Sequence, residues 1–365
     1  MDHLRRRAPE GNSPGLPMGR RRFLKLATAA AVALPAWAVG LGMPRRTARA
    51  ESDVDPEWEE TGPPTPLGRI ATWWGQAVRE TPTLRGTWLE TKRRDDVINL
   101  YAAVEGEAPW PTNSTWFRTD GGYIHSGYVQ PVRDDEQDVV RTVSATGFWA
   151  QIARPWAEAR WTVNSPYRAA KLYYGTVYRV VRTVVDEDDV AWYQLQEGYT
   201  PYRPSIYAPA TSLRPISRRE LRPISPGRND KLIRIDRSAQ TVSCYEGDRK
   251  VYGTPCGTGH HNTPTPRGEF TVLYKRHTRR MNVQNIPDPY DLPGVAYPTY
   301  FTWSGVAIHG TYWHNDYGRV HSHGCVNVSH GAARWIFRWV DPVCPYEAYT
   351  AEADSERPGT RVIVT

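Results

Sequence analysis

The sequence predicts a mainly β protein, in which two small β-barrel-like units precede an antiparallel β-sandwich-like domain with one packed helix. Three observations support this fold class. Short segments of alternating apolar and polar residues, separated by Gly, Pro and Asp, dominate the chain after residue 83. A strand–turn–strand pattern occurs twice, at Trp116–Tyr123 and Trp192–Tyr199. One amphipathic helical stretch follows Ser329.

Residues 1–50 are predicted to be an export signal. Arg20 and Arg21 precede Phe23, an uncharged run follows from Leu26 to Met43, and Ala48–Ala50 offers a small-x-small cleavage site. The segment resembles a twin-arginine signal, cleaved near Ala50. A retained membrane anchor is the alternative, because about 18 apolar residues can just span a bilayer. In both cases we expect the protein outside the cytoplasm, in the cell wall or at the extracytoplasmic face of the membrane.

The positive charge of the chain comes from this leader. The whole sequence has a net charge of +7, but residues 1–50 hold ten of its 46 basic residues and two of its 39 acidic ones. The rest of the chain therefore has 36 basic and 37 acidic residues. A nearly neutral body has no general attraction for phosphate backbones, so we expect no nucleic-acid partner.

The region before residue 228 is predicted to divide into three parts. Residues 51–82 form an acidic spacer, 83–150 a first β-barrel-like unit, and 151–227 a second such unit with a proline-rich linker. The repeated aromatic and glycine pattern resembles bacterial Src-homology-3-like barrels, which often accompany enzymes of the cell wall. The resemblance implies that these units bind the wall. We expect the repeated aromatics themselves to be core residues, namely Trp116, Tyr123, Trp192 and Tyr199.

Residues 228–365 are predicted to form the third and largest domain. Alternating segments predict strands over 231–236, 241–245, 250–256, 270–274, 306–309 and 361–364. A helix is predicted to begin after Ser329 as its N-cap, to bury a stripe that includes Ile336 and Phe337, and to end near Pro342.

A cysteine and a histidine of this domain are the candidate reactive groups. His309 ends an apolar strand, and Cys325 follows 16 residues later within Ser322-His323-Gly324-Cys325-Val326-Asn327. An imidazole can take the proton of a thiol that attacks a carbonyl carbon. The small residues before Cys325 would let backbone N–H groups, those of Gly324 and Cys325, approach a developing oxyanion. The other three cysteines form no C-x-x-C pair, and their pairing state is left open.

This arrangement resembles the catalytic domain of L,D-transpeptidases. That family's signature is a histidine, a spacer, and Ser/Thr-His-Gly-Cys followed by an apolar residue and Asn. Upstream segments also resemble the family, from Ser238-x-Gln240 through Gly257-Thr258-Gly259 to Thr263–Phe270. The resemblance implies that Cys325 is the nucleophile, His309 the base, and the carbonyl of Gly310 the group that orients the imidazole. It assigns loop geometry and substrate contact to Ser322, His323 and Asn327.

The resemblance also implies a substrate and a reaction. Cys325 would attack the tetrapeptide stem of peptidoglycan, release D-Ala and transfer the acyl group to an amine of a neighbouring stem. A carbapenem would acylate the same thiol. The connection 275–304 would form a flap over the cleft, and its aromatics together with Trp313 would line the donor pocket or pack in the core. These aromatics are Tyr290, Tyr297, Tyr300, Phe301 and Trp303.

Two other functions compete with this prediction. His309, His314, His321, His323 and Cys325 could be ligands of a zinc-dependent peptidoglycan peptidase, although no H-E-x-x-H spacing is present. Alternatively, the chain could be a wall-binding protein without catalysis. For the transpeptidase we expect no cofactor and a monomer. The third stem residue and the acyl acceptor remain open.

Overall fold

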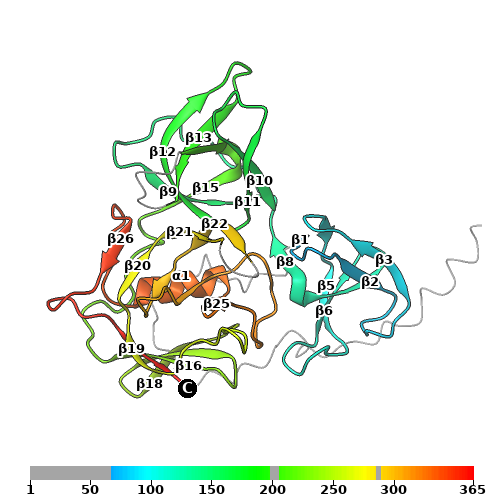
Figure 1. Ribbon diagram of the computed structural model, residues 1–365. Helices are drawn as coiled ribbons and strands as arrows, with labels where there is room; N and C mark the ends of the chain where they lie inside the picture. Colours follow the sequence, from blue (N-terminus) through cyan, green and yellow to red (C-terminus); the bar gives the residue numbers. More distant parts are fainter. Residues whose placement is uncertain (1–66, 198–204, 285–288) are drawn as a thin grey trace, which may run out of the picture. The chain divides into compact units, whose positions relative to one another are not determined.

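The computed structural model describes residues 67–197, 205–284 and 289–365 (Figure 1). The predicted signal over residues 1–50 and Tyr199 of the repeat lie outside these ranges. All the described residues belong to one compact unit. The described part is mainly β, as predicted, with a single α-helix, α1 (His330–Trp339). No helix within it is long and apolar enough to cross a membrane.

The first β unit begins earlier than predicted. It contains a three-stranded sheet of order β4-β1-β8 and a five-stranded sheet of order β3-β2-β7-β6-β5. Its strands are β1 (Leu67–Ile70), β2 (Gln76–Arg79), β3 (Trp88–Lys92), β4 (Val97–Asn99), β5 (Ala102–Glu105), β6 (Thr115–Thr119), β7 (Gly122–His125) and β8 (Val129–Val132). The boundary at residue 83 is wrong, because β1 and β2 lie within the predicted spacer and pair with later strands.

The second β unit is a seven-stranded sheet of order β11-β10-β14-β13-β12-β9-β15. Its strands are β9 (Phe148–Ile152), β10 (Trp156–Arg160), β11 (Arg168–Tyr173), β12 (Val177–Val185), β13 (Ala191–Gln196), β14 (Ile206–Pro209) and β15 (Leu213–Ile216). The predicted boundary at 150 cuts β9, and the predicted linker supplies two strands. Prolines are tolerated there because Pro209 ends its strand and Pro215 lies on an edge strand.

The repeated tryptophans are core residues, as predicted. Trp116 lies on β6 and Trp192 on β13, and both side chains are buried. Each strand continues into an antiparallel partner, β7 for the first and β14 for the second. Their indole N–H groups donate within their own units, to the Glu107 carbonyl and to Asp186 Oδ2.

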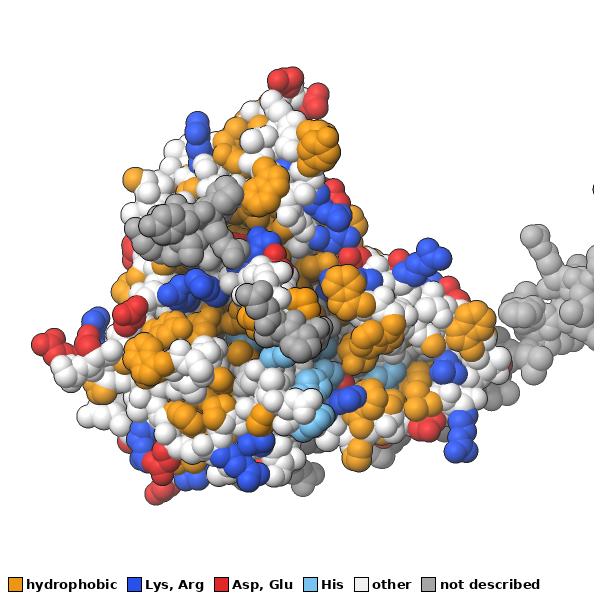
Figure 2. Space-filling model, viewed as in Figure 1, with side chains coloured by type: hydrophobic (Ala, Val, Ile, Leu, Met, Phe, Trp, Pro, Cys, Tyr) orange, Lys and Arg blue, Asp and Glu red, His pale blue; other side chains and the backbone are white. Residues whose placement is uncertain are grey.

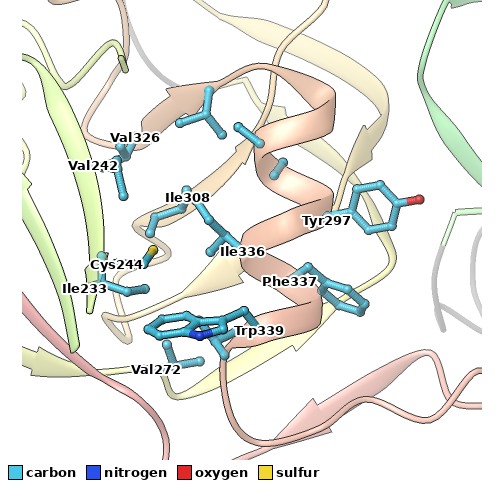
Figure 3. Packing of buried hydrophobic residues seen from close by; sticks show 14 of the residues in the cluster. Ile233, Val242, Cys244, Val272, Tyr297, Ile308, Val326, Ile336, Phe337 and Trp339 are labelled. Atoms are coloured by element: carbon cyan, nitrogen blue, oxygen red, sulfur yellow. The ribbon is translucent and has the colours of Figure 1, made fainter. Parts of the chain in front are cut away.

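The C-terminal domain packs two five-stranded sheets and α1 around one core. The first sheet has the order β18-β17-β16-β27-β19, and the second β25-β24-β23-β20-β26. The strands are β16 (Lys231–Asp236), β17 (Thr241–Glu246), β18 (Arg249–Pro255), β19 (Gly268–Thr271), β20 (Tyr274–Arg276), β21 (Thr278–Val283), β22 (Tyr290–Ala296), β23 (Thr299–Tyr300), β24 (Ala307–Gly310), β25 (Val326–Val328), β26 (Thr350–Glu352) and β27 (Arg361–Val364). Figure 3 shows Ile336 and Trp339 of α1 among side chains from these strands, including Ile233, Val242 and Ile308. Burying this apolar stripe is what stabilises an otherwise isolated helix.

The helix begins where the sequence predicts. Ser329 is its N-cap, and its Oγ accepts the N–H of Ala332 at 3.2 Å. At the other end, the buried Nζ of Lys275 donates to the carbonyls of Phe337 and Val340, both at 2.6 Å. Burial lowers the pKa of Lys275 to about 7, so the charged form that offsets the helix dipole prevails only below neutral pH.

One strand of this domain differs from the prediction. The single strand expected over 270–274 is two strands in different sheets. The crossing occurs at Val272, whose N–H bonds the Thr360 carbonyl, and Leu273, whose N–H bonds the Tyr300 carbonyl. The pairing is otherwise mostly antiparallel, as predicted, with two parallel pairs, β16 with β27 and β24 with β25.

Candidate active site

His309 lies on β24 with its ring orientation fixed. Its Nδ1 is 3.1 Å from the Gly310 carbonyl oxygen, the contact that the sequence prediction requires. Because a carbonyl can only accept, Nδ1 carries the proton and Nε2 presents a lone pair. Burial lowers the pKa of His309 to about 4, with a smaller opposing effect of the Gly310 hydrogen bond. The imidazole is therefore a neutral base at neutral pH.

Cys325 directly precedes β25, the strand beside β24. The parallel register pairs Ile308 with Val326 and His309 with Asn327. Since side chains alternate between the faces of a strand, those of Cys325 and His309 lie on the same face of this sheet. The thiol is partly exposed and donates to the Gly305 carbonyl at 3.8 Å. Burial raises its pKa to about 11, so the resting pair is a neutral thiol and a neutral imidazole.

The turn before Cys325 is held by hydroxyl groups. Ser322 Oγ accepts the N–H of Gly324 at 3.0 Å and donates to the Cys325 carbonyl at 2.5 Å. Thr265 Oγ1 donates to the Gly324 carbonyl at 2.8 Å. Gly324 has a φ of 119°, which a side chain would strain. Because its N–H is already bonded to Ser322, Gly324 does not offer the oxyanion donor that the sequence predicts.

Gly310 lies close to the first residue of α1. A Cβ at this position would lie 3.1 Å from Cδ2 of His330, the first residue of α1. The sequence prediction assigned His330 no role, although its ring packs behind the carbonyl that orients His309. Its Nε2 is buried without a hydrogen-bond partner.

Asn327 and His323, two of the residues predicted to shape the loop and contact the substrate, differ in their exposure. Asn327 is fully buried, and its amide lies 2.9 Å from His314 Nε2, so it has no surface for a substrate. Its backbone pairs with Gly257. His323 is exposed, and its ring centroid is 5.4 Å from that of Tyr290.

The aromatic candidates differ in whether they lie near the reactive residues, in the core or at the surface. Trp313 lies 5.8 Å from His309 between ring centroids, and the pKa of Tyr290 is raised by burial and then by the nearby Cys325. Tyr300 is buried in a stack on Tyr274, and its pKa is also raised by burial and then by Cys325. Tyr297 is not a pocket residue, because it packs in the core 5.3 Å from Phe337. Phe301 is also in the core, whereas Trp303 is 84% exposed beside a shallow cleft.

The predicted flap is partly a hairpin. Strands β21 and β22 pair antiparallel within the connection 275–304. The loop between β24 and β25 contains three of the histidines considered as zinc ligands, His314, His321 and His323, and Figure 2 shows histidine side chains gathered on one face. His314 and His321 stack face to face at 4.2 Å, and their nitrogens contact Asn327 and Asp316. In the described part of the chain, no three His, Cys, Asp or Glu side chains converge as metal ligands.

Comparisons with known proteins find similarity to one protein family. The family model of the L,D-transpeptidase catalytic domain (YkuD) matches residues 230–364. L,D-transpeptidase 1 of Mycobacterium tuberculosis is 33% identical over 116 residues, which are 29% of this chain and 46% of that protein. A probable L,D-transpeptidase 3 of the same organism is 31% identical over 94 residues, covering 24% and 35%. The chain thus spans about half or less of the length of these relatives.

Solved structures of similar proteins carry the same family name. An L,D-transpeptidase from Mycobacterium smegmatis has 21% identity and a TM-score of 0.31, covering 48% of this chain and 90% of that one. The catalytic domain of an E. faecium L,D-transpeptidase has 26% identity and a TM-score of 0.30, covering 37% and 97%. Residues 230–364 therefore form a domain of the L,D-transpeptidase catalytic family, on the strength of the family model and the sequence relatives.

Proposed function

We propose that this protein is an exported cysteine L,D-transpeptidase acting on the tetrapeptide stems of peptidoglycan. The observation that carries the proposal is the orientation of His309. Its Nδ1 is engaged by the Gly310 carbonyl, and Cys325 directly precedes the neighbouring parallel strand. A base with a defined free nitrogen beside a partly exposed thiol is the minimal apparatus for acyl transfer through a thioester.

In the acylation step, Cys325 Sγ attacks the carbonyl carbon of the amide between the third stem residue and D-Ala. His309 Nε2 takes the thiol proton as the carbon–sulfur bond forms. The carbon–nitrogen bond then breaks, and the proton passes from His309 to the leaving amine of D-Ala. Because the resting groups are neutral, proton transfer accompanies the attack and no ion pair forms beforehand.

In the second step, an amine of a neighbouring stem attacks the thioester. The new amide forms, the carbon–sulfur bond breaks, and the amine's proton returns through His309 to Cys325. The N–H of Cys325 is our candidate oxyanion donor, because that of Gly324 is bonded to Ser322. Tyr290, Tyr300 and Trp313 are the candidate walls of the stem-binding site.

The remaining parts of the chain fit an enzyme that works outside the cytoplasm. Residues 1–50 are the proposed export signal, and the two β units are proposed to bind the wall. The predicted monomer remains part of the proposal.

The test is D-Ala release from a purified tetrapeptide muropeptide by the full chain and by Cys325→Ala. We expect turnover to be lost while the circular dichroism spectrum is retained. Cys344→Ala is the matched control, because it removes a buried thiol near another histidine. A carbapenem should add its mass to the native chain and to Cys344→Ala, but not to Cys325→Ala. Turnover by Cys325→Ala would refute the proposal and favour a wall-binding or metal-dependent protein.

A further inference from the structure

The loop between β24 and β25 contains a buried carboxylate that the proposed reaction does not use. The side chain of Asp316 is fully buried. Its Oδ2 accepts from His321 Nε2 at 2.8 Å. Its Oδ1 accepts from two side chains of the first β unit, Trp110 Nε1 at 2.9 Å and Asn113 Nδ2 at 3.0 Å. A buried carboxylate with this many donors is fixed in position.

These donors also keep Asp316 charged. Burial by itself raises the pKa of the carboxyl group, but the hydrogen bonds from His321, Asn113 and Trp110 outweigh it and hold the pKa below its usual value. Arg319 lies 3.4 Å from Oδ2, and its guanidinium stacks 3.9 Å from the centre of the Trp110 ring. The first β unit therefore supplies part of what stabilises a charge inside the C-terminal domain.

The first β unit is shaped for this contact. Asn113 Oδ1 accepts the backbone N–H of Thr115 at 3.1 Å, so its amide nitrogen must face Asp316. The Gly127 carbonyl accepts the N–H of Asn315 at 2.8 Å. A Cβ on Gly127 would lie 3.1 Å from the Asp316 carboxyl carbon, so glycine permits the close approach.

Asp316 is connected to the strand beside His309 through two imidazoles. His321 stacks on His314, and His314 Nδ1 accepts the N–H of Asp316 at 3.2 Å. A neutral imidazole has one N–H, so Nε2 must donate to the Asn327 amide 2.9 Å away. The acceptor on Asn327 must then be its Oδ1, which means that the positions of Oδ1 and Nδ2 are exchanged. The exchange gives a hydrogen-bond partner to this buried oxygen, which otherwise has none. Asn327 is the register partner of His309.

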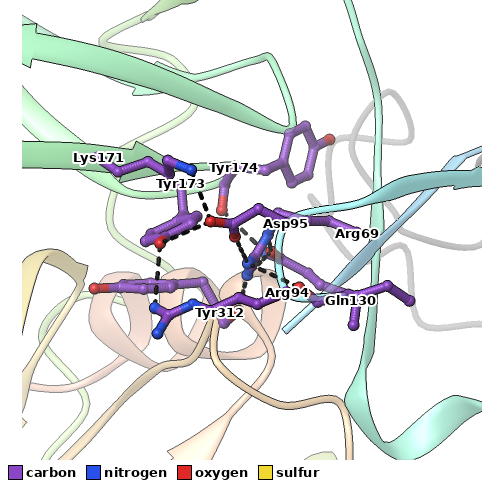
Figure 4. A network of polar contacts seen from close by, with 9 residues as sticks. Arg69, Arg94, Asp95, Gln130, Lys171, Tyr173, Tyr174 and Tyr312 are labelled. Atoms are coloured by element: carbon purple, nitrogen blue, oxygen red, sulfur yellow. Dashed lines mark hydrogen bonds and ion pairs between the residues drawn. The ribbon is translucent and has the colours of Figure 1, made fainter. Parts of the chain in front are cut away.

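A second contact reaches the same loop nearer to His309. Figure 4 shows Arg69, on β1 of the first unit, between Asp95, Gln130 and Tyr312. Arg69 Nη1 donates to Asp95 at 2.9 Å and Nε to Gln130 at 3.0 Å, while Nη2 donates to the Tyr312 carbonyl. The first β unit thus holds the loop at Tyr312 and at Asp316, on either side of His314.

We propose that Asp316 is a positioning residue through which the first β unit sets the geometry of His309 and Cys325. Trp110 and Asn113 fix the carboxylate, which aligns His321 and His314. His314 in turn fixes Asn327, which is the register partner of His309 and lies two residues after Cys325. The first β unit is then part of the catalytic apparatus in addition to any role in wall binding. This proposal rests on the proposed function where it predicts a change in D-Ala release. Its predictions for the alkylation of Cys325 and for the protonation of His314 do not depend on that function.

The test compares Asp316→Asn and Trp110→Phe with the native full chain. Asp186→Asn and Trp192→Phe are matched controls, because Trp192 Nε1 donates to Asp186 at 2.7 Å within the second β unit. We expect kcat for D-Ala release to fall about tenfold in Asp316→Asn and about threefold in Trp110→Phe, with KM within about twofold. The rate of Cys325 alkylation by iodoacetamide should change in the same two variants and in neither control. Nitrogen NMR of the native chain should show His314 protonated at Nε2.

The outcomes separate this proposal from the proposed function. Unchanged alkylation and kcat in folded Asp316→Asn and Trp110→Phe would overturn it, as would a His314 protonated at Nδ1. If Asp316→Asn does not fold, Trp110→Phe and Gly127→Ala, which presses on the same carboxylate, decide the question. If the native chain releases no D-Ala but alkylation still responds to these substitutions, the proposed function fails and the positioning role stands.

Discussion

Two cysteine–histidine pairs in the described structure differ in what surrounds them. Cys344 Sγ lies 3.7 Å from Nδ1 of His277, a direct contact. That imidazole is fully buried, stacked on Trp149 at 4.4 Å and beside Phe337 at 4.8 Å, and its Nε2 has no partner. Cys325 is partly exposed, and its histidine is held through Nδ1 by a carbonyl. The cysteine in direct contact with an imidazole is thus the buried one, which a peptide cannot reach.

The electrostatics of the two pairs are nearly the same. Burial raises the pKa of Cys325 to about 11 and that of Cys344 to about 12. It also lowers the pKa of His309 to about 4 and that of His277 well below its ordinary value. A perturbed pKa is therefore a poor guide to the reactive pair here. Access to the sulfur and a fixed tautomer of the base distinguish the candidate site from a packed core.

The largest contrast is expected on replacing each histidine. His309→Asn removes the base, and D-Ala release should fall by about 10³-fold. His277→Asn should leave turnover within about twofold and lower the melting temperature, because it places an amide between aromatic rings. Turnover and thermal unfolding measured on both variants check this. Loss of turnover in a folded His277→Asn, with activity kept in His309→Asn, would reverse the assignment.

The second contrast concerns alkylation of the two thiols. Iodoacetamide reacts with the thiolate, so the rate at Cys325 should rise about tenfold per pH unit from pH 7 and level off only near pH 11. Cys344 should react about 100-fold more slowly, because its exposure requires local unfolding. Peptide mass spectrometry of chains treated for increasing times distinguishes the two sites. A plateau near pH 7 at Cys325 would show a preformed ion pair and contradict the neutral resting state.

Sequence reasoning could propose His309 and Cys325 as the reactive pair because the signals for them are local. The histidine at a strand end, the Ser-His-Gly-Cys turn and the Ser329 N-cap each depend on neighbours within a few residues. The same reasoning failed for Gly324 and Asn327. The sequence marks both as site residues, but their hydrogen-bonding groups are already engaged by Ser322 and His314.

The parts that could not be predicted depend on pairing between distant segments. The spacer and the linker were misassigned because β1, β2, β14 and β15 are short, and their strand character comes from partners elsewhere in the chain. No motif in the sequence marks Asp316. Its role emerges only from Trp110 and Asn113, which are about 200 positions away, and no periodicity in the sequence relates them.

The smallest contrast is expected in the acid stability of the chain. His309 has a pKa of about 4 in the fold and an ordinary value of 6.5 when unfolded, so the unfolded chain takes up a proton between these pH values. Stability is therefore complete above pH 6.5 and is lost as the pH falls towards 4, by on the order of 3 kcal/mol for this residue. The shift of His277 has the same direction, and its loss extends further into acid.

His309→Phe and His277→Phe divide this acid loss between the two pairs. Each should flatten the dependence of the unfolding free energy on pH between 6.5 and 4, measured by urea denaturation at fixed pH values. The two differ in function, because His277→Phe should keep D-Ala release and His309→Phe should not. If neither variant changes the slope, the two imidazoles are already protonated in the fold at pH 5. In that case burial does not hold His309 neutral, and the resting state would be an ion pair of protonated His309 with the Cys325 thiolate.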